Sequence, residues 1–339
     1  MTNPFIMRQC KQNTSSSTLR DEDIAVGVTV PESKAPVPHV KSPFGYFGSK
    51  QRLASKIAEI LPPHNAWVEA FCGSAAVTLR KKPAPIEIIN DIDQQIVNFF
   101  KQLREKPEEL CEAIELTPYA REEFALSKTA DKTQNLLEQA RRFLVASMMT
   151  VNGAFGSNHD GRNHSGFSYS QSYARNGVEA RVSRWNALPE RLRKVFDRLK
   201  TVRVESRDAR ELVKMFWDKP ATLVYLDPPY LTERNHGYNM DANEESFHRD
   251  LLEVCCRARC MVLISGYDHR LYSSVLTRKR GWRRVTIETH TRDTKGKDYA
   301  RTEVLWKNKF FIKAERDKKV PIRLTAEEKA QNKVNPSRK

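Results

Sequence analysis

The sequence lacks the features that mark membrane, secreted or metal-dependent proteins. No apolar run reaches transmembrane length, and the polar N-terminus has no signal-peptide core. The eight histidines show no HExxH spacing, and the six cysteines show no zinc-like pairing. Cys255, Cys256 and Cys260 fall on an expected helix, where buried free thiols are the default. These absences predict a soluble protein of a reducing cytoplasm, without a metal ion.

A nucleotide-binding P-loop is also missing. Residues 45–49 form a glycine-containing loop that leads into an expected helix with apolar positions at Leu53, Ile57 and Ile60. The Walker spacing of glycine, four residues and Gly-Lys-Ser/Thr is not met around Lys50. By residue type alone, Lys50 is then a solvated loop lysine.

Positive charge is abundant. The 339 residues carry a formal net charge of +16, which favours a polyanion as partner. A chain of this length is sufficient for a full α/β core and a smaller second domain. Neither observation identifies an enzyme.

The most informative segment is TLVYLDPPY, at residues 222–230. Its first five residues are β-favouring and nearly all apolar, as in a strand buried on both faces of a parallel sheet. Pro228 and Pro229 lack N–H groups and fix φ, so they end the strand in a stiff turn with free carbonyl oxygens. Ligands bind at this edge of open α/β sheets.

The turn has the groups needed to activate an aromatic amino group. Its lone pair is delocalised into the ring, and hydrogen bonds to two acceptors favour the pyramidal nitrogen that can attack an electrophilic methyl group. Asp227 and the Pro228 carbonyl supply these acceptors, and Tyr230 offers a flat ring for a flipped-out base. An ordinary Pro-Pro turn is the alternative.

Two further strand ends precede this motif. Residues 66–79 predict a strand, a tight loop from Phe71 to Ser74 and a helix from Ala75, whose N-terminus would approach the amino-acid end of a cofactor. Eighteen residues after Gly73, another apolar strand ends at Asp91, a predicted ribose ligand. Asp93 is the alternative ligand, and either acid can instead cap a helix.

About 130 residues separate this half from the catalytic strand, which predicts an inserted domain. Residues 108–150 have helical spacing, followed by loops rich in Gly, Asn and Ser with interleaved aromatics. Residues 141–205 contain twelve Lys or Arg against five acids, which favours a DNA-reading surface. The expected core residues are Leu110, Ile114, Phe124, Leu126, Leu136, Leu137, Phe143, Leu144 and Met148.

Asp-Pro-Pro-Tyr resembles the catalytic motif of amino-group methyltransferases that use S-adenosylmethionine. The order of cofactor motif, glycine loop, ribose acid, long insert and catalytic motif over residues 43–310 resembles the Dam-like, alpha-group DNA adenine-N6 methyltransferases. Two departures stand out: Ala70 replaces the usual proline of the glycine loop, and Ser157 replaces a usual arginine of the recognition region. A GATC target is therefore not carried over.

The resemblance implies a Rossmann-like, S-adenosylmethionine-dependent α/β sheet with an inserted, mainly helical target-recognition domain. It implies direct methyl transfer to the N6 amino group of an adenine in double-stranded DNA, with no covalent enzyme intermediate. The catalytic residues are then Asp227, Pro228, Pro229 and Tyr230. The cofactor-binding residues are Tyr46, Lys50, Phe71, Gly73, Asp91, Asp208 and Asp227.

Some of these residues have a second interpretation. An N-cap is as good an account of Asp208 as the cofactor adenine is. The DNA-binding candidates, whose guanidinium and amide groups reach either base edges or phosphates, are Asn152, Arg162, Asn163 and Arg175. Residues 231–246 are polar and favour a lid.

Four domain segments are expected: a disordered tail at 1–40, a catalytic domain at 41–107 and 201–312, a target-recognition domain at 108–200, and a basic tail at 313–339. The protein is expected to be a monomer or weak dimer in the cytoplasm of a bacterium or phage-infected cell, near the nucleoid. A companion restriction endonuclease remains open. The alternatives are an RNA adenine or DNA cytosine-N4 methyltransferase, a noncatalytic DNA-binding protein on this scaffold and, more remotely, a dehydrogenase.

Overall fold

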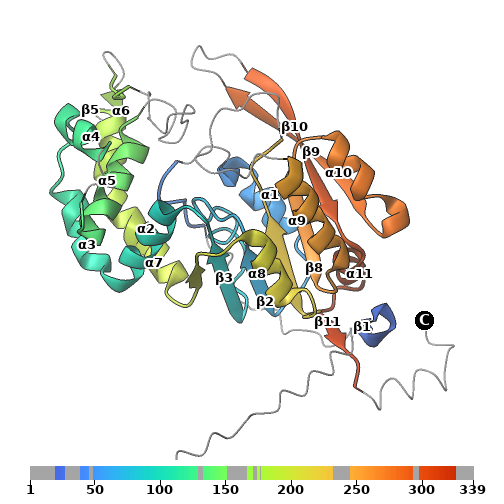
Figure 1. Cartoon of the computed structure of the whole chain (residues 1–339). Coiled ribbons are helices and arrows are strands. Elements are labelled where there is room, and N and C mark those ends of the chain that lie inside the picture. The colour runs from blue at the N-terminus through green and yellow to red at the C-terminus, as the bar shows by residue number, and fades with distance from the viewer. Residues whose placement is uncertain are drawn as a thin grey trace, which may run out of the picture.

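The computed structural model describes most of the chain outside the two ends and several loops (Figure 1). Helices gather in one lobe beside a twisted central sheet, which has further helices on both faces. The described residues are 20–26, 39–45, 49–128, 133–150, 166–170, 174–175, 177–231, 245–292 and 298–325.

The central sheet has seven strands in the order β6-β3-β2-β7-β8-β10-β9. The first five are parallel to one another, while β10 is antiparallel to both of its neighbours. Counted along the chain, the order is 3-2-1-4-5-7-6, a doubly wound order with one antiparallel strand inserted before the last. The strands are β2 (Ala66–Glu69), β3 (Ile86–Asn90), β6 (Arg203–Glu205), β7 (Thr222–Leu226), β8 (Met261–Gly266), β9 (Arg283–Arg292) and β10 (Asp298–Lys307).

The predicted buried strand is confirmed, because every residue of β7 is buried, as is every residue of β8. Successive side chains point to opposite faces. Trp67 and Leu223 pack with α1 (Ala54–Glu59) and α11 (Lys309–Asp317) on one face. Val68 and Val224 pack on the other face with α8 (Ala209–Phe216), α9 (Glu245–Arg257) and α10 (Arg270–Val275).

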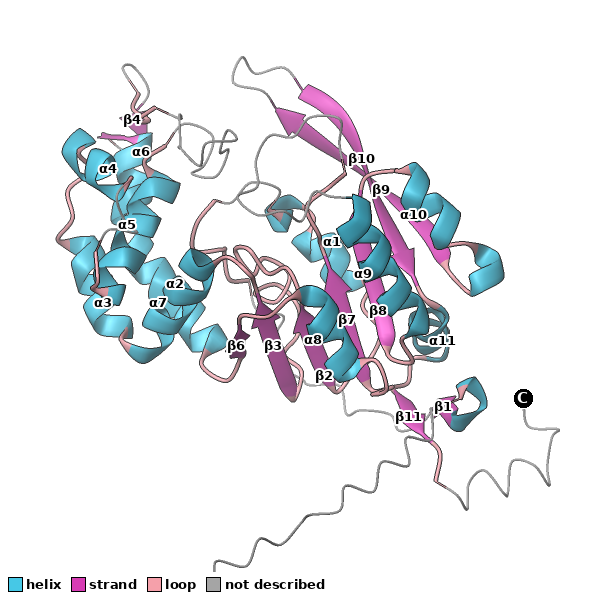
Figure 2. Cartoon of the chain, in the orientation of Figure 1, coloured by secondary structure: helices cyan, strands magenta, loops and turns pink. Residues whose placement is uncertain are grey.

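The inserted segment is helical, as predicted, and Figure 2 shows its helices gathered to one side of the sheet. Their apolar faces form one core with the edge of the sheet domain. Leu126 and Leu136, expected in the core, are 47% and 54% exposed, because the helices they lie on turn other residues inward. The lobe contains α2 (Gln94–Glu105), α3 (Pro107–Glu115), α4 (Arg121–Ser127), α5 (Leu136–Met148), α6 (Ala180–Asn186), α7 (Leu188–Leu199) and the small hairpin β4 (Ala174–Arg175) and β5 (Val178–Glu179).

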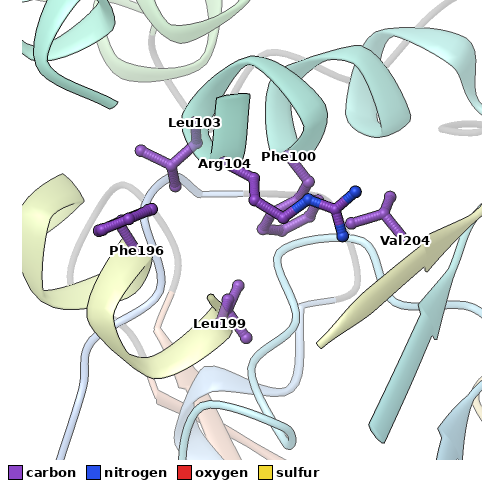
Figure 3. A pocket seen from close by; sticks show the side chains of 6 residues that line it. All are labelled: Phe100, Leu103, Arg104, Phe196, Leu199 and Val204. Atoms are coloured by element: carbon purple, nitrogen blue, oxygen red, sulfur yellow. The ribbon is translucent and has the colours of Figure 1, made fainter. Parts of the chain in front are cut away.

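An apolar cleft lies between α2, α7 and β6 (Figure 3). Arg104 is the charged residue of its lining, and its guanidinium donates to the Val202 carbonyl over 3.2 Å. Apart from Arg104, the side chains that line the cleft are apolar. The other lining residues are Phe100, Leu103, Phe196, Leu199 and Val204.

The two predicted tails are partly ordered, which corrects their boundaries. β1 (Ile24–Val26) pairs antiparallel with β11 (Pro321–Arg323), and Ile24 is buried. Helix α11 continues beyond residue 313 and buries Ala314 in the core. These elements could not be predicted from the sequence, because each is short and lies next to charged residues. Within the described ranges, 3-10 helices outside the site are formed at Asp21–Asp23 and at Arg278–Arg280.

Candidate active site

Asp227 lies directly after β7, where the strand order reverses between β2 and β7. Ligands bind at this switch point in doubly wound sheets. The Lys50 ammonium donates to both carboxylate oxygens, over 2.7 and 2.8 Å, and the Ser265 hydroxyl donates to Oδ1 over 2.9 Å. A hydrogen bond of 2.9 Å links the hydroxyls of Ser265 and Tyr225 behind it. The carboxylate is thus held in one orientation.

Lys50 joins the predicted cofactor motif to the catalytic motif. It begins the 3-10 helix Lys50–Arg52, is 6% exposed, and places its ammonium 4.8 Å from the centre of the Tyr230 ring. Burial alone would lower the pKa of Lys50, but the negative charges of Asp227 and Glu303 outweigh it and raise this pKa. Lys50 therefore stays charged, and its described contacts are with the catalytic groups.

Tyr230 contacts both halves of the site. Its hydroxyl lies 2.9 Å from Asp227 Oδ1 and 2.6 Å from Glu303 Oε1, and it also contacts the Lys50 ammonium. Its ring centre lies 4.4 Å from that of Tyr267, with the two planes tilted by 58°. Burial and the nearby carboxylates raise the pKa of Tyr230 well above its ordinary value, so its hydroxyl keeps its proton.

The sequence reasoning did not assign Ser265 or Glu303 to the site. Ser265 is the penultimate residue of strand β8, and Glu303 lies at the start of the buried run of β10. A charged residue next to the apolar run Val304, Leu305 and Trp306 was the available signal for Glu303. The sequence did not show that Tyr230 is the partner of Glu303, because the two residues meet only through the antiparallel pairing of β10 with β8.

The glycine loop differs from its prediction. Residues 73–80 form consecutive turns instead of a regular helix from Ala75. Gly73 and Ala75 have φ of 47° and 53°, in the left-handed region that interrupts a helix. Glu69 fixes the loop by accepting hydrogen bonds from the backbone N–H of Thr78, over 3.0 Å, and from its hydroxyl. The loop is therefore organised around a buried acid.

Asp91 lies at the end of β3, beside this loop. Its carboxylate accepts hydrogen bonds from the Gly73 N–H over 2.8 Å and from the Asp93 N–H over 3.0 Å. Burial raises the pKa of Asp91 to about 6, and these hydrogen bonds oppose the shift. Asp93 caps α2 through the Gln95 N–H. Of the two candidate acids, Asp91 is thus the one that is bound to the glycine loop.

Phe71 and Asp208 lie on neighbouring elements. The Phe71 ring meets that of Phe247 edge-on at 6.4 Å, and the Arg210 guanidinium lies 4.9 Å from the Phe247 ring centre. Asp208 is the N-cap of α8 and accepts from the Arg210 N–H over 2.7 Å. Hydrogen bonds from Arg210 lower the pKa of Asp208. The N-cap interpretation of Asp208 is therefore confirmed.

Several predicted site residues lie outside the described part of the chain. Tyr46 of the cofactor motif is one, and most of the predicted lid is another. Arg175 lies on β4, where its backbone pairs with Val178. The recognition candidates outside the described residues are Asn152, Arg162 and Asn163, together with Ser157.

The doubly wound sheet, with Asp-Pro-Pro-Tyr at its switch point and a helical insert before it, defines a Rossmann-like methyltransferase. The model of the D12 class N6 adenine-specific DNA methyltransferase family matches residues 46–284. The chain belongs to this family, which confirms the resemblance seen in its motifs.

Two curated relatives are similar over more than half of the chain. The type II methyltransferase M1.LlaDCHI of Lactococcus lactis subsp. cremoris is 26% identical over 196 residues, which are 54% of this chain and 63% of the relative. The modification methylase StsI of Streptococcus sanguinis is 28% identical over 210 residues, 57% of this chain and 29% of the relative. The matched part thus spans about three fifths of the length of the first relative and under a third of the length of the second.

Among solved structures, a SAM-dependent methyltransferase from Agrobacterium tumefaciens is 11% identical, with a TM-score of 0.24, and covers 38% of this chain and 46% of that chain. The fold assignment rests on the strand order instead. Within the described ranges, no helix is long and apolar enough to cross a membrane. Nor do the described histidines, cysteines and acids form a group of three or more that would hold a metal ion.

Proposed function

We propose that this protein transfers a methyl group from S-adenosylmethionine to the N6 amino group of a flipped-out adenine at a specific site in double-stranded DNA. The observation that carries the proposal is the anchored carboxylate of Asp227 at the switch point of the sheet, in a chain of this family. Lys50 and Ser265 fix its orientation before substrate binds, which is the preorganisation that a charged transition state needs.

In the proposed reaction, Asp227 and the Pro228 carbonyl accept hydrogen bonds from the adenine amino group. This geometry favours a pyramidal nitrogen whose lone pair is free to attack. Once it bears the methyl group, the nitrogen carries positive charge, which the Asp227 carboxylate stabilises until the nitrogen releases one of its two protons. Pro229 stiffens the turn, and the Tyr230 ring supplies the stacking surface for the base.

S-adenosylmethionine supplies an electrophilic methyl group when it is bound. The loop that contains Phe71 and Gly73 fits such a ligand, because its left-handed glycine lets a ligand approach the backbone. Asp91 suits the ribose hydroxyls, since its carboxylate already has a fixed orientation at the adjacent strand end. Tyr46 and Asp208 remain proposed contacts from the family resemblance.

DNA is proposed to bind the part of the helical lobe at residues 108–200, which is the proposed target-recognition domain. Tyr169 is 54% exposed and stacks against Phe167 with the two planes 21° apart. The Arg121 guanidinium lies 5.0 Å from the Phe167 ring centre and 5.6 Å from the Tyr169 ring centre. Arginine held on an aromatic surface suits both phosphate contact and base stacking. Asn152, Arg162, Asn163 and Arg175 are proposed to read the target from this lobe.

The proposed setting is the cytoplasm of a bacterium or of a phage-infected cell, with the protein acting as a monomer or weak dimer. The two relatives are named as a type II methyltransferase and a modification methylase. We extend that role to this chain and propose that its methylation protects DNA from a companion endonuclease. Plasmid DNA from expressing cells should then resist that nuclease.

The deciding experiment is nucleoside mass spectrometry with methylation-sensitive single-molecule sequencing of DNA from cells that express wild type or Asp227→Ala. N6-methyladenine at one motif, with wild type only, would support the proposal. Methyl groups on cytosine N4 or on RNA would favour those substrates instead. No new methylated base, from soluble protein that fails to bind S-adenosylmethionine, would favour a noncatalytic DNA-binding protein.

A further inference from the structure

Glu303 is a second carboxylate at the catalytic motif. It lies on β10, next to Val304, which pairs with Gly266 at the end of β8. Glu303 is 4% exposed, although its strand is antiparallel and lies outside the parallel part of the sheet. A buried acid needs partners, because an ionised carboxylate without them is strongly destabilising.

Glu303 has two partners, Tyr230 and Lys50, and both of them also contact Asp227. The Tyr230 hydroxyl lies 2.6 Å from Glu303 Oε1, and the Lys50 ammonium lies 3.5 Å from the same oxygen. Asp227 Oδ1 is 2.9 Å from that hydroxyl. A tyrosine hydroxyl has one proton, so the two carboxylates compete for it.

This competition matters when the adenine amino group arrives. Asp227 must then accept a hydrogen bond from the substrate, which weakens the hydrogen bonds that it accepts from Lys50 and Tyr230. A buried ammonium or hydroxyl left without a partner would cost free energy. Glu303 offers both groups another acceptor in the same place, so the substrate does not have to leave them unpaired.

We propose that Glu303 is a positioning residue, which takes the Tyr230 hydroxyl and the Lys50 ammonium as Asp227 engages the adenine and thereby keeps the Tyr230 ring in place for the base. This role rests on the adenine methylation proposed above. It makes β10, and not only the family motif, a part of the reaction site.

The test compares Glu303→Gln and Glu303→Ala with wild type in steady-state methylation of DNA. Glutamine keeps an acceptor for Tyr230 and loses the charge that Lys50 needs, whereas alanine loses both. We expect kcat to fall about tenfold for glutamine and about a hundredfold for alanine, since each lost buried contact weakens the site further. Affinity for S-adenosylmethionine, measured by calorimetry, should stay within about twofold.

The matched control is Glu288→Gln, which removes the same charge from an exposed residue of β9, opposite Thr302 in the register. It should methylate like wild type.

The pH profile gives a second readout. Burial and the negative charge of Asp227 raise the pKa of Glu303, while Lys50 and Tyr230 oppose the shift. Wild-type kcat/KM should fall as pH drops through this pKa, and Glu303→Gln should lose that dependence.

Two results would overturn the role of Glu303. One is Glu303→Gln with the kcat and pH profile of the Glu288→Gln control. The other is a loss of activity in both Glu303 variants that parallels equal losses of cofactor affinity and melting temperature, which would mean a purely structural acid. A wild-type protein that methylates no DNA would instead contradict the proposed function.

Discussion

Among single residues, Glu69 makes the stability of the fold depend on pH. It is 3% exposed, and burial raises its pKa to about 7, although hydrogen bonds from Thr78 oppose the shift. An acid whose pKa is raised on folding binds its proton more tightly in the native state. The free energy of unfolding therefore decreases as pH rises from about 4.5 to about 7.

Glu69→Gln should remove this dependence. At pH 8 the variant should be more stable than wild type by up to about 3 kcal/mol, since it has no buried charge to form. Below pH 4.5, the ordinary value for this acid, the two proteins should unfold alike. Urea denaturation at several pH values measures the difference, and parallel curves for both proteins would contradict the assignment to Glu69.

Tyr230 makes a separate prediction at the residue scale, because its ring and its hydroxyl have different roles. Tyr230→Ala should weaken the binding of the flipped base by ~1–3 kcal/mol, through loss of stacking. Tyr230→Phe keeps the ring and should retain most of this binding. The fluorescence of 2-aminopurine at the target position reports the flipped base, and equal signals from the alanine variant and wild type would exclude the stacking role.

At the scale of elements, α7 is fastened to the sheet by a buried ion pair. The Arg198 guanidinium on α7 donates to both carboxylate oxygens of Glu87 on β3, over 2.6 and 3.0 Å, and to the Thr78 carbonyl over 2.8 Å. Lys81 also donates to Glu87, at Oε1 over 2.6 Å. The helical lobe is thus tied to the loop that Glu69 organises.

Arg198→Ala should destabilise the protein by about 3–5 kcal/mol, because removal of one partner leaves buried charge less compensated. The exposed Lys194→Ala, on the same helix, is the control and should change stability by less than about 0.5 kcal/mol. Chemical denaturation of both variants measures these values. A similar small effect for both would mean that the helix is held by its apolar face alone.

The elements differ in how far the sequence predicts them. Strand β7 could be predicted from the sequence, because an uninterrupted apolar run before two prolines fits few structures other than a buried strand. The turns after Gly73 could not be predicted, because the left-handed backbone conformation of Ala75 and the hydrogen bond from Thr78 to Glu69 depend on tertiary packing. Tertiary structure also limits the prediction of the site. The Asp-Pro-Pro-Tyr motif predicted Asp227 and Tyr230, whereas Ser265 and Glu303 reach the site only because β8 and then β10 follow β7 in the strand order.

For the whole molecule, the formal charge of +16 should make DNA binding strongly dependent on salt. The logarithm of the binding constant should fall linearly with the logarithm of salt concentration, with a slope of about −0.9 per phosphate contact. Arg121→Ala should reduce the magnitude of this slope by about 1 if Arg121 contacts a phosphate. Fluorescence anisotropy with a duplex measures it, and Lys313→Ala on α11 is the control.

An unchanged slope with lower affinity for the methylated motif only would place Arg121 at a base. An unchanged slope and affinity would remove the surface formed by Arg121, Phe167 and Tyr169 from the DNA interface. These three outcomes separate a general electrostatic attraction from recognition by the helical lobe.

The placement of β10 between β8 and β9 has a consequence for how the protein is made. A ribosome releases β9 before the strand that separates it from the rest of the sheet, so β9 cannot join the sheet until β10 follows. Glu303 arrives with that strand, long after Lys50 and Asp227 have been synthesised. A nascent chain thus carries the Asp-Pro-Pro-Tyr motif without its full surroundings, and the order of translation itself delays assembly of the site.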